Sequence, residues 1–486
     1  MFADDVYRLS EAQYYNRVLL IDTDRLNDMT NYCGIFAEKG FTVIWFSDDL
    51  TFRVNNDEFL HDDQLKLIII AKANIYIPYD IRKMCHVVDV TLAALYPRLN
   101  SSVLREPTTD FDLLSQAYAG CYDQLTSPQQ TASFMQNVVN GRDNVKHYIE
   151  VRMNVLKEAV CVARTYQDWF RISDMKAQID VQATQYEIQV DTEFIDQAFE
   201  NFILNSFGTL SSVLNADTPV LVSRAMEYMH EHSDRFVIIV MDGMSQFDWE
   251  IISESFVGMN YTKADMYAMI PTVTSVSRQC LLSNKYPLQL INPWSQSKEK
   301  QEFTECATDM GYLPTQMGYE RGYDAAFAAS VKCGAVIIND VDDMVHGQMQ
   351  GRIGMLNDIG VLSNQKKLVE LTKCLISQGF DVYITADHGN TPCVGMGKLM
   401  GTGVETETKS RRMLVLKDFA DKQTIKEKYQ LIEYPKYYLN KSYDYLICPA
   451  GKSFDAKNDE VMSHGGITLD EVIVPFIKIK AGDNNG

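Results

Sequence analysis

Four short apolar segments in the second half of the chain constrain its fold more than any other feature. They cover residues 235–240, 334–338, 381–385 and 471–476. Stretches with helical periodicity, such as 365–377, lie between them. Apolar runs of this length that alternate with helices are typical of a doubly wound α/β domain with a mostly parallel sheet. Ligands of such domains bind beyond the carboxyl ends of the strands.

Aspartate and histidine residues stand at the ends of these four segments. Asp242 follows the first segment, and the acidic run 339–346, which ends in a histidine, follows the second. Asp387 and His388 follow the third, and His464 comes just before the fourth. Carboxylates and neutral imidazoles together suit zinc and similar divalent cations. We therefore expect a metal site at one edge of the sheet, because the ends of parallel strands meet there.

A hydroxyl-rich segment, residues 270–278, lies between the first two apolar segments and precedes a possible helix at 279–283. Threonine and serine are preferred as helix N-caps, so this segment has a structural explanation. A helix N-terminus also attracts anions through its free N–H groups, so one hydroxyl could serve as a nucleophile towards phosphate. The two interpretations are compatible.

The rest of the chain divides into two further parts. Apolar runs at 17–22, 41–46 and 65–70, with a helix at 26–39, predict a small α/β domain over 1–110. From about residue 111 the sequence has apolar residues at helical spacing instead of the apolar runs that predict strands. We expect a helical bridge over 111–215 and the catalytic domain over 216–486.

One alternative for the first domain is a phosphorelay receiver, since Asp22 and Asp24 follow its first apolar run. A receiver needs an aspartate at the end of its third strand, where this chain has Ala71 and Lys72. A structural domain, or one that docks partner proteins, is the preferred interpretation.

Charge and composition exclude several functions. The chain of 486 residues has 45 Lys and Arg against 65 Asp and Glu, a net charge of −20. Such an acidic protein is a poor match for duplex DNA or for anionic membranes. We expect no membrane span, because no apolar run is long enough, and no signal peptide, because the first residues lack its basic start and apolar core. Ten scattered cysteines without a CxxC pair favour a reducing cytoplasm.

Four motifs in the second half resemble one known family. The segments 240–245 (VMDGMS), 271–278 (PTVTSVSR), 385–390 (TADHGN) and 464–466 (HGG) are similar, in order and spacing, to the PglZ domain of the alkaline phosphatase superfamily. The resemblance covers about 235–480. Standalone PglZ proteins belong to phage-defence systems, and a related domain with phosphodiesterase activity occurs in PorX-type response regulators.

The resemblance implies two metal ions, which we expect to be zinc. One would be held by Asp242, Thr274, Asp387 and His388, and the other by Asp342, His346 and His464.

Thr274 is implied as the nucleophile because the diesterase pattern reads Pro-Thr-x-Thr, and Thr272 and Ser275 remain alternatives. Asp342 is preferred over its acidic neighbours because the family pattern is Asp-x-x-x-His, which His346 completes.

The implied activity is that of a two-metal phosphoesterase with Thr274 as nucleophile and Arg278 as a contact to a phosphate oxygen. Near Thr274 only Arg278 and Lys285 are basic, which favours a singly charged phosphodiester. We expect short oligonucleotides, cyclic nucleotides or small diesters as substrates, and defence or signalling proteins as partners of the first domain. The pair Arg411 and Arg412 is interpreted as surface charge, with substrate contact as the alternative.

The main rival function is a non-catalytic defence scaffold that binds metal for stability. A complete ligand set together with a hydroxyl nucleophile argues against it. A phosphomutase of the same superfamily is a second rival. It would need a dense basic pocket, and the sequence has no such cluster.

Overall fold

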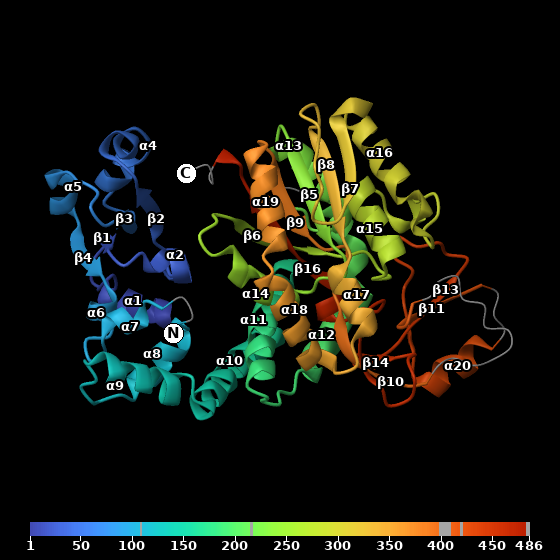
Figure 1. Cartoon of the computed structure of the whole chain (residues 1–486), viewed down its shortest axis with the longest axis horizontal. Coiled ribbons are helices and arrows are strands. Elements are labelled where there is room, and N and C mark those ends of the chain that lie inside the picture. The colour runs from blue at the N-terminus through green and yellow to red at the C-terminus, as the bar shows by residue number, and fades with distance from the viewer. Residues whose placement is uncertain (107–108, 214–216, 398–409, 418–420, 483–486) are drawn as a thin grey trace. The chain divides into compact units, whose positions relative to one another are not determined.

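The computed structural model describes residues 1–106, 109–213, 217–397, 410–417 and 421–482 (Figure 1). The chain forms two compact units, residues 1–151 and 152–486, and helix α10 (Arg142–Val162) contains the boundary between them. The domain boundary expected at 215–216 falls on residues outside the described ranges, so the division into three parts stays a prediction.

The first unit contains a four-stranded parallel sheet in the order β2-β3-β1-β4. Its strands are β1 (Arg17–Asp22), β2 (Thr42–Phe46), β3 (Leu67–Lys72) and β4 (His86–Val90). The first three coincide closely with the predicted apolar runs. β4 was not predicted because histidine and aspartate interrupt its sequence HVVDV, in which Val90 is the one fully buried residue, so it lacks a continuous apolar run.

The helices of the first unit are short. They are α1 (Phe2–Leu9), α2 (Leu26–Thr30), α3 (Gly34–Glu38), α4 (Asp49–His61), α5 (Tyr79–Met84), α6 (Leu92–Leu95), α7 (Ser101–Leu104), α8 (Phe111–Ala119) and α9 (Pro128–Phe134). The single helix predicted over 26–39 is wrong. Asn31 adopts a left-handed conformation with φ +49°, and the side chain of Asn27 accepts a hydrogen bond from the Cys33 amide at 2.9 Å. These contacts divide the segment into α2 and α3.

Two long helices open the second unit and form part of its core. α11 (Tyr166–Gln185) and α12 (Glu193–Ser206) carry Trp169 and Phe199, whose ring centroids lie 5.0 Å apart. Phe199 in turn stacks on Tyr267 of the central sheet at 6.4 Å. In addition, the ammonium group of Lys176 on α11 is buried 2.7 Å from Asp470, at the far end of the chain. α11 and α12, the part of the predicted helical region that lies in the second unit, are therefore packed onto the central sheet.

The central sheet of the second unit has six strands in the order β6-β16-β9-β5-β8-β7. The strands are β5 (Phe236–Met241), β6 (Thr262–Tyr267), β7 (Met317–Arg321), β8 (Cys333–Ile338), β9 (Asp381–Thr385) and β16 (Ile473–Ile479). β9, β5, β8 and β7 are parallel neighbours, and β16 is antiparallel to β9 and β6. The predicted α/β class with a mostly parallel sheet is confirmed.

The direction of β16 matters for the site. Because it runs against β9, its first residue lies at the edge of the sheet where β9, β5 and β8 end. Residues before β16 and residues after the parallel strands therefore meet at one edge (Figure 1). The short helix α21 (Leu469–Val472) leads directly into β16.

Helices and two small sheets surround the central sheet. The further helices are α13 (Ala225–His232), α14 (Gln246–Ser253), α15 (Thr274–Ser283), α16 (Glu299–Asp309), α17 (Asp340–Gly347), α18 (Gly351–Asn364), α19 (Lys367–Ser377) and α20 (Lys422–Tyr429). One small sheet joins β14 (Lys452–Ser453), β10 (Thr391–Gly395) and β15 (Glu460–Ser463), and the other joins β11 (Met413–Leu416), β13 (Asp444–Ile447) and β12 (Ile432–Glu433).

Two findings bear on the environment of the chain. Among the described helices, none combines the length and the apolar character needed to cross a membrane. All ten cysteines are free thiols.

Candidate two-metal site

Five acidic and imidazole side chains converge at the edge where the parallel strands end. Asp242 follows β5, and Asp387 and His388 follow β9. Asp342 lies in the first turn of α17, directly after β8, and His464 lies between β15 and β16. They form two groups whose ligand atoms lie within 4.8 Å of one another, and His388 belongs to both groups. One group contains the two aspartates 242 and 387, and the other contains Asp342 with His464.

Backbone carbonyls orient the two buried imidazoles. Nδ1 of His388 lies 3.0 Å from the Gly389 carbonyl, and Nδ1 of His464 lies 2.9 Å from the Thr272 carbonyl. A carbonyl only accepts, so in each ring Nδ1 carries the proton and Nε2 offers a lone pair. Nε2 of His464 is 3.3 Å from Asp342. Such outer contacts commonly fix the tautomer of metal-binding histidines.

His346 stands at the rim of this arrangement. Its Nε2 lies 3.3 Å from Oδ2 of Asp342, one helical turn away on α17, and its ring centroid is 5.3 Å from that of His464. It is not a member of either group of ligand atoms. Its side chain is 43% exposed, against 11% for His464. The site is therefore more open on the side of His346.

Two carboxylate oxygens in the site lack a hydrogen-bond partner. They are Oδ1 of Asp342 and Oδ2 of Asp387, both buried. A buried, unpaired carboxylate oxygen is costly, and a cation would satisfy it. Burial and the charge of Asp242 also raise the pKa of Asp387 well above its usual value, so a nearby cation is needed to keep it ionised. The donor set therefore fits divalent metal ions.

Asp342 and the neighbouring imidazoles of His346 and His464 affect one another's pKa values. Burial alone would raise the pKa of Asp342, but the hydrogen bond from His346 and the charges of His464 and His388 bring it below its usual value. Burial, reinforced by the charge of His388, lowers the pKa of His464 to about 4. Neutral His464 next to ionised Asp342 is the protonation state that binds metal.

Thr274 is the first residue of α15 and lies between the ligands. Its Oγ1 is 3.3 Å from Oδ1 of Asp242 and 3.2 Å from Nε2 of His388. The hydroxyl of Thr272, the first alternative nucleophile, already makes two hydrogen bonds. It donates to the Gly466 carbonyl at 2.9 Å and accepts from the Gly465 amide at 3.1 Å.

Ser275, the other alternative, is only partly buried, and its hydroxyl makes no hydrogen bond within the described residues. The helix also begins earlier than the predicted 279–283, so that Thr274 sits in its first turn.

Arg278 is fully buried and engaged by two carboxylates. Its Nη1 donates to Oδ2 of Asp242, and its Nε donates to Glu299 at 2.7 Å. Glu299 is itself buried and accepts from Arg321 at 3.0 Å and from the hydroxyl of Tyr319. The predicted contact of Arg278 with phosphate would therefore have to use N–H groups other than the Nε–H and the Nη1–H that these carboxylates accept. Glu299 lies on α16, outside every motif, so the sequence offered no signal for it.

Other supporting residues also escaped the sequence analysis. Asn390 donates to the Gly243 carbonyl at 2.9 Å and to Asp248 at 2.6 Å, and so ties the loop after β9 to the loop after β5. The interpretation of Arg412 as surface charge is wrong, because it is fully buried 3.3 Å from Glu471. Its position after an apparent loop hid this role.

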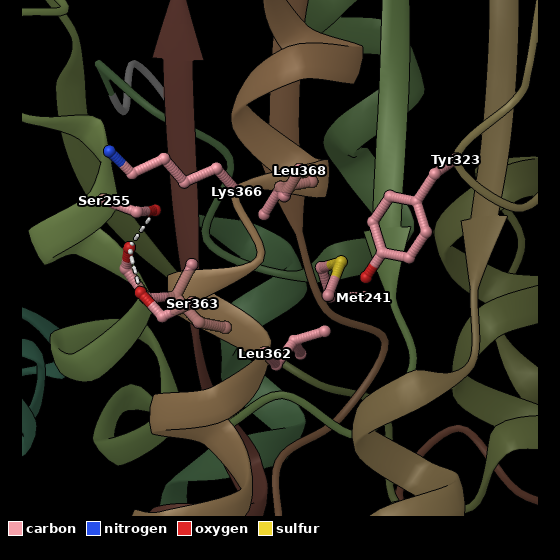
Figure 2. A pocket seen from close by; sticks show the side chains of 8 residues that line it. Met241, Ser255, Tyr323, Leu362, Ser363, Lys366 and Leu368 are labelled. Carbon is pink, nitrogen blue, oxygen red and sulfur yellow. Dashed lines mark hydrogen bonds between the residues drawn. The ribbon is translucent and has the colours of Figure 1, made fainter.

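A small pocket is lined in part by Met241, the residue before Asp242 in the chain (Figure 2). Its lining is mainly apolar and includes Met241, Tyr323 and Leu368. The Ile252 carbonyl, which accepts from the hydroxyl of Ser255 at 2.7 Å, closes one side. None of the candidate metal ligands lines this pocket.

Fold and site together define an α/β domain with clustered carboxylate and imidazole ligands at the carboxyl edge of its sheet. Residues 222–479 match the family model of the BREX system PglZ alkaline phosphatase-like domain. The chain belongs to this family. No curated protein matches it.

Solved structures with some similarity include two ectonucleotide pyrophosphatase/phosphodiesterase 5 proteins. The murine protein, inactive and in complex with AMP, is 12% identical with a TM-score of 0.38; the match covers 51% of this chain and 88% of that one. The human protein is 14% identical with a TM-score of 0.35; the match covers 51% of this chain and 89% of that one. Matches with scores this low carry no argument about the activity of this chain.

Proposed function

We propose that the chain is a metal-dependent phosphoesterase that cleaves phosphodiesters with Thr274 as its nucleophile. One observation carries this proposal. The Thr274 hydroxyl lies 3.3 Å from Asp242 and 3.2 Å from His388, within a cluster whose remaining carboxylates have unpaired buried oxygens. A scaffold that binds metal only for stability has no use for a hydroxyl in that position.

The residues that would hold metal divide as the family pattern implies. Asp242, Asp387 and His388, with Thr274, would hold one cation, and Asp342 and His464, with His346 at the rim, would hold the other. Mixed carboxylate and imidazole ligands favour zinc. Bound divalent cations would lower the pKa of the attacking hydroxyl and neutralise charge on the phosphoryl oxygens.

The chain's own residues supply the nucleophile and its orientation. Oγ1 of Thr274 would form a bond to phosphorus while the bond from phosphorus to the leaving alcohol breaks, giving a phosphothreonine diester. Water then hydrolyses this ester, restores the threonine and releases a phosphomonoester. Arg278 holds Oδ2 of Asp242, which leaves Oδ1 directed at Thr274. We assign Arg278 a positioning role on this basis.

The charges near Thr274 support a diester over a monoester. Arg278 is neutralised by Asp242 and Glu299. Lys285, the other basic residue near it in sequence, lies 2.6 Å from Glu302 and is also paired with a second glutamate. A monoester dianion would need additional unpaired cations around the phosphate. Short oligonucleotides, cyclic nucleotides or small diesters match the site better.

The family description, which places related domains in BREX systems, supports a proposal for the cellular role. We propose a cytoplasmic role in phage defence or signalling, in which the α/β domain over 1–110 docks partner proteins.

Metal analysis combined with a phosphoester panel tests the proposed function. Purified protein should contain two divalent cations per chain and should hydrolyse bis(p-nitrophenyl) phosphate with a higher kcat/KM than p-nitrophenyl phosphate. Preference for the monoester would contradict the diesterase proposal but not the two-metal site. Two bound metals without turnover of any ester would instead favour the scaffold.

A further inference from the structure

The segment 410–412 is fixed against the turn that carries His464. Oγ of Ser410 lies so close to Gly465 that a Cβ at that glycine would come within 2.0 Å of it. Gly465 has φ +113°, a conformation that other residues rarely adopt, so this close approach depends on glycine. The Arg411 carbonyl accepts from the amide of Phe454 at 2.8 Å. The backbone of Arg411 therefore has a defined position beside the metal site.

A buried ion pair secures the same segment from its other side. Arg412 lies 3.3 Å from Glu471, and both side chains are fully buried. Glu471 accepts from the Gly466 amide at 2.7 Å, which holds the turn after His464. Glu471 therefore contacts both the segment 410–412 and the turn after His464, and it holds the two together.

The side chain of Arg411 differs from that of Arg412 because it is 39% exposed and has one carboxylate partner among the described residues, Asp455, at 3.3 Å. The segment that carries it lies against the turn of His464, whose ring centroid is 5.3 Å from that of His346. His346 marks the open side of the site, as its exposure of 43% shows. Arg411 therefore lies where a substrate would enter or extend.

We propose that Arg411 forms an anion subsite for a second phosphate of the substrate, next to the phosphate that is cleaved. A guanidinium paired with one carboxylate keeps N–H donors for a phosphate, and its planar fork suits bidentate binding. By contrast, Arg278 and Lys285 each have two carboxylate partners. This inference rests on the proposed function and narrows its substrate class to short oligonucleotides rather than cyclic mononucleotides.

The test compares two dinucleotides, thymidylyl-thymidine with and without a 5′-terminal phosphate. They share one scissile diester and differ only in the second phosphate. For the wild type we expect kcat/KM to be higher for the phosphorylated dinucleotide by about tenfold, equal to about 1.4 kcal/mol. Arg411→Gln should reduce this ratio to near one, and Arg411→Lys should keep part of it because the charge remains.

Arg224→Gln is the matched control. Arg224 is 47% exposed and has one carboxylate partner, Glu227, at 3.1 Å, and it lies ahead of α13, away from the segment 410–412. The control should keep the wild-type ratio. An unchanged ratio in Arg411→Gln would overturn the inference while leaving the phosphodiesterase proposal intact.

A binding measurement separates this inference from the proposed function. Calorimetry measures how tightly two metal-loaded variants bind each dinucleotide. One variant carries Thr274→Ala alone, which prevents turnover, and the other carries Thr274→Ala together with Arg411→Gln. If the wild type hydrolyses neither these dinucleotides nor any ester of the phosphoester panel, the proposed function fails. The binding data still test the anion subsite. Tighter binding of the phosphorylated dinucleotide that is lost in Arg411→Gln supports the subsite, and equal affinities with and without Arg411→Gln overturn it.

Discussion

Replacing Glu299 by glutamine tests whether a carboxylate behind Arg278 controls the metal site in front of it. Glu299 is buried and accepts from Arg278 at 2.7 Å, from Arg321 at 3.0 Å and from Tyr319. Glutamine preserves the size of the side chain and one acceptor oxygen but removes the negative charge. Arg278 would then have Asp242 as its remaining charged hydrogen-bond partner among the described residues.

The magnitude follows from the burial of this network. Breaking a buried ion pair costs about 3–5 kcal/mol. Because glutamine keeps one acceptor, we expect the lower end, about 3 kcal/mol. In a large domain this lowers the melting temperature by about 6–10 °C. Arg278 would also hold Asp242 more tightly, and loss of such an outer contact commonly lowers metal affinity by about tenfold or more.

The assay pairs thermal melting with titration of metal against a competing chelator. Glu305→Gln is the matched control, because Glu305 lies on the same helix, is 43% exposed and pairs with Lys285 at 3.2 Å. Exposed pairs of this kind contribute about 0–1 kcal/mol, so the control should resemble the wild type.

Two outcomes would count against this reasoning. If Glu299→Gln melted and bound metal like the Glu305→Gln control, the buried network would have no energetic role. If it melted earlier but bound metal normally, Glu299 would support the fold without positioning Asp242.

Three further predictions follow from the site and from a second buried cluster. Thr274→Ala should lower turnover by roughly 10³-fold or more while metal content and melting temperature stay near wild type, and Ser275→Ala should remain active; comparable rates in both variants would mean that the wrong hydroxyl was chosen. Chelation should lower the melting temperature reversibly, because metal stabilises the folded state by mass action, and His464→Ala should bind about one metal equivalent fewer by elemental analysis; full metal content in that variant would contradict the assignment. Burial, together with the charges of Asp174 and Asp265, raises the pKa of Glu250 to about 7, and Lys263 opposes this rise. The folded state therefore favours the protonated carboxyl group, and this contribution to stability is lost as the pH rises from the pKa of the unfolded chain towards 7. Glu250→Gln should therefore raise the melting temperature more at pH 8 than at pH 5, and equal effects at both values would rule out this titration.

The sequence predicted the central strands well because they are uniformly apolar. β5 and β8 are buried along their whole length, and a local pattern reports that directly. β6 was missed, since its sequence TKADMY is half polar and reads as a loop. The antiparallel direction of β16 was also not foreseen, because a pattern of residues contains no information about which strand is its neighbour.

The candidate site shows the same limit. Residues at strand ends, such as Asp242 and His388, could be named from the sequence because their positions follow from the fold class. Glu299 could not, because it reaches Arg278 from a different helix, 21 residues along the chain. Arg412 could not be recognised as buried, because its partner Glu471 is distant in sequence and a charged pair in a loop resembles surface. Contacts of this kind are a property of tertiary packing.

The packing of α11 and α12 determines where the second unit of the chain can be cut. The family match begins at residue 222, but the compact unit begins at 152. A fragment that started at 222 would leave Tyr267 without the aromatic cover of Phe199, and Asp470 would lose the ammonium group of Lys176 and keep the guanidinium of Arg352 at 2.7 Å. Exposed aromatic surface promotes aggregation, and the loss of Lys176 weakens a buried ion-pair cluster. The portable module for expression, or for exchange between related proteins, is therefore 152–486.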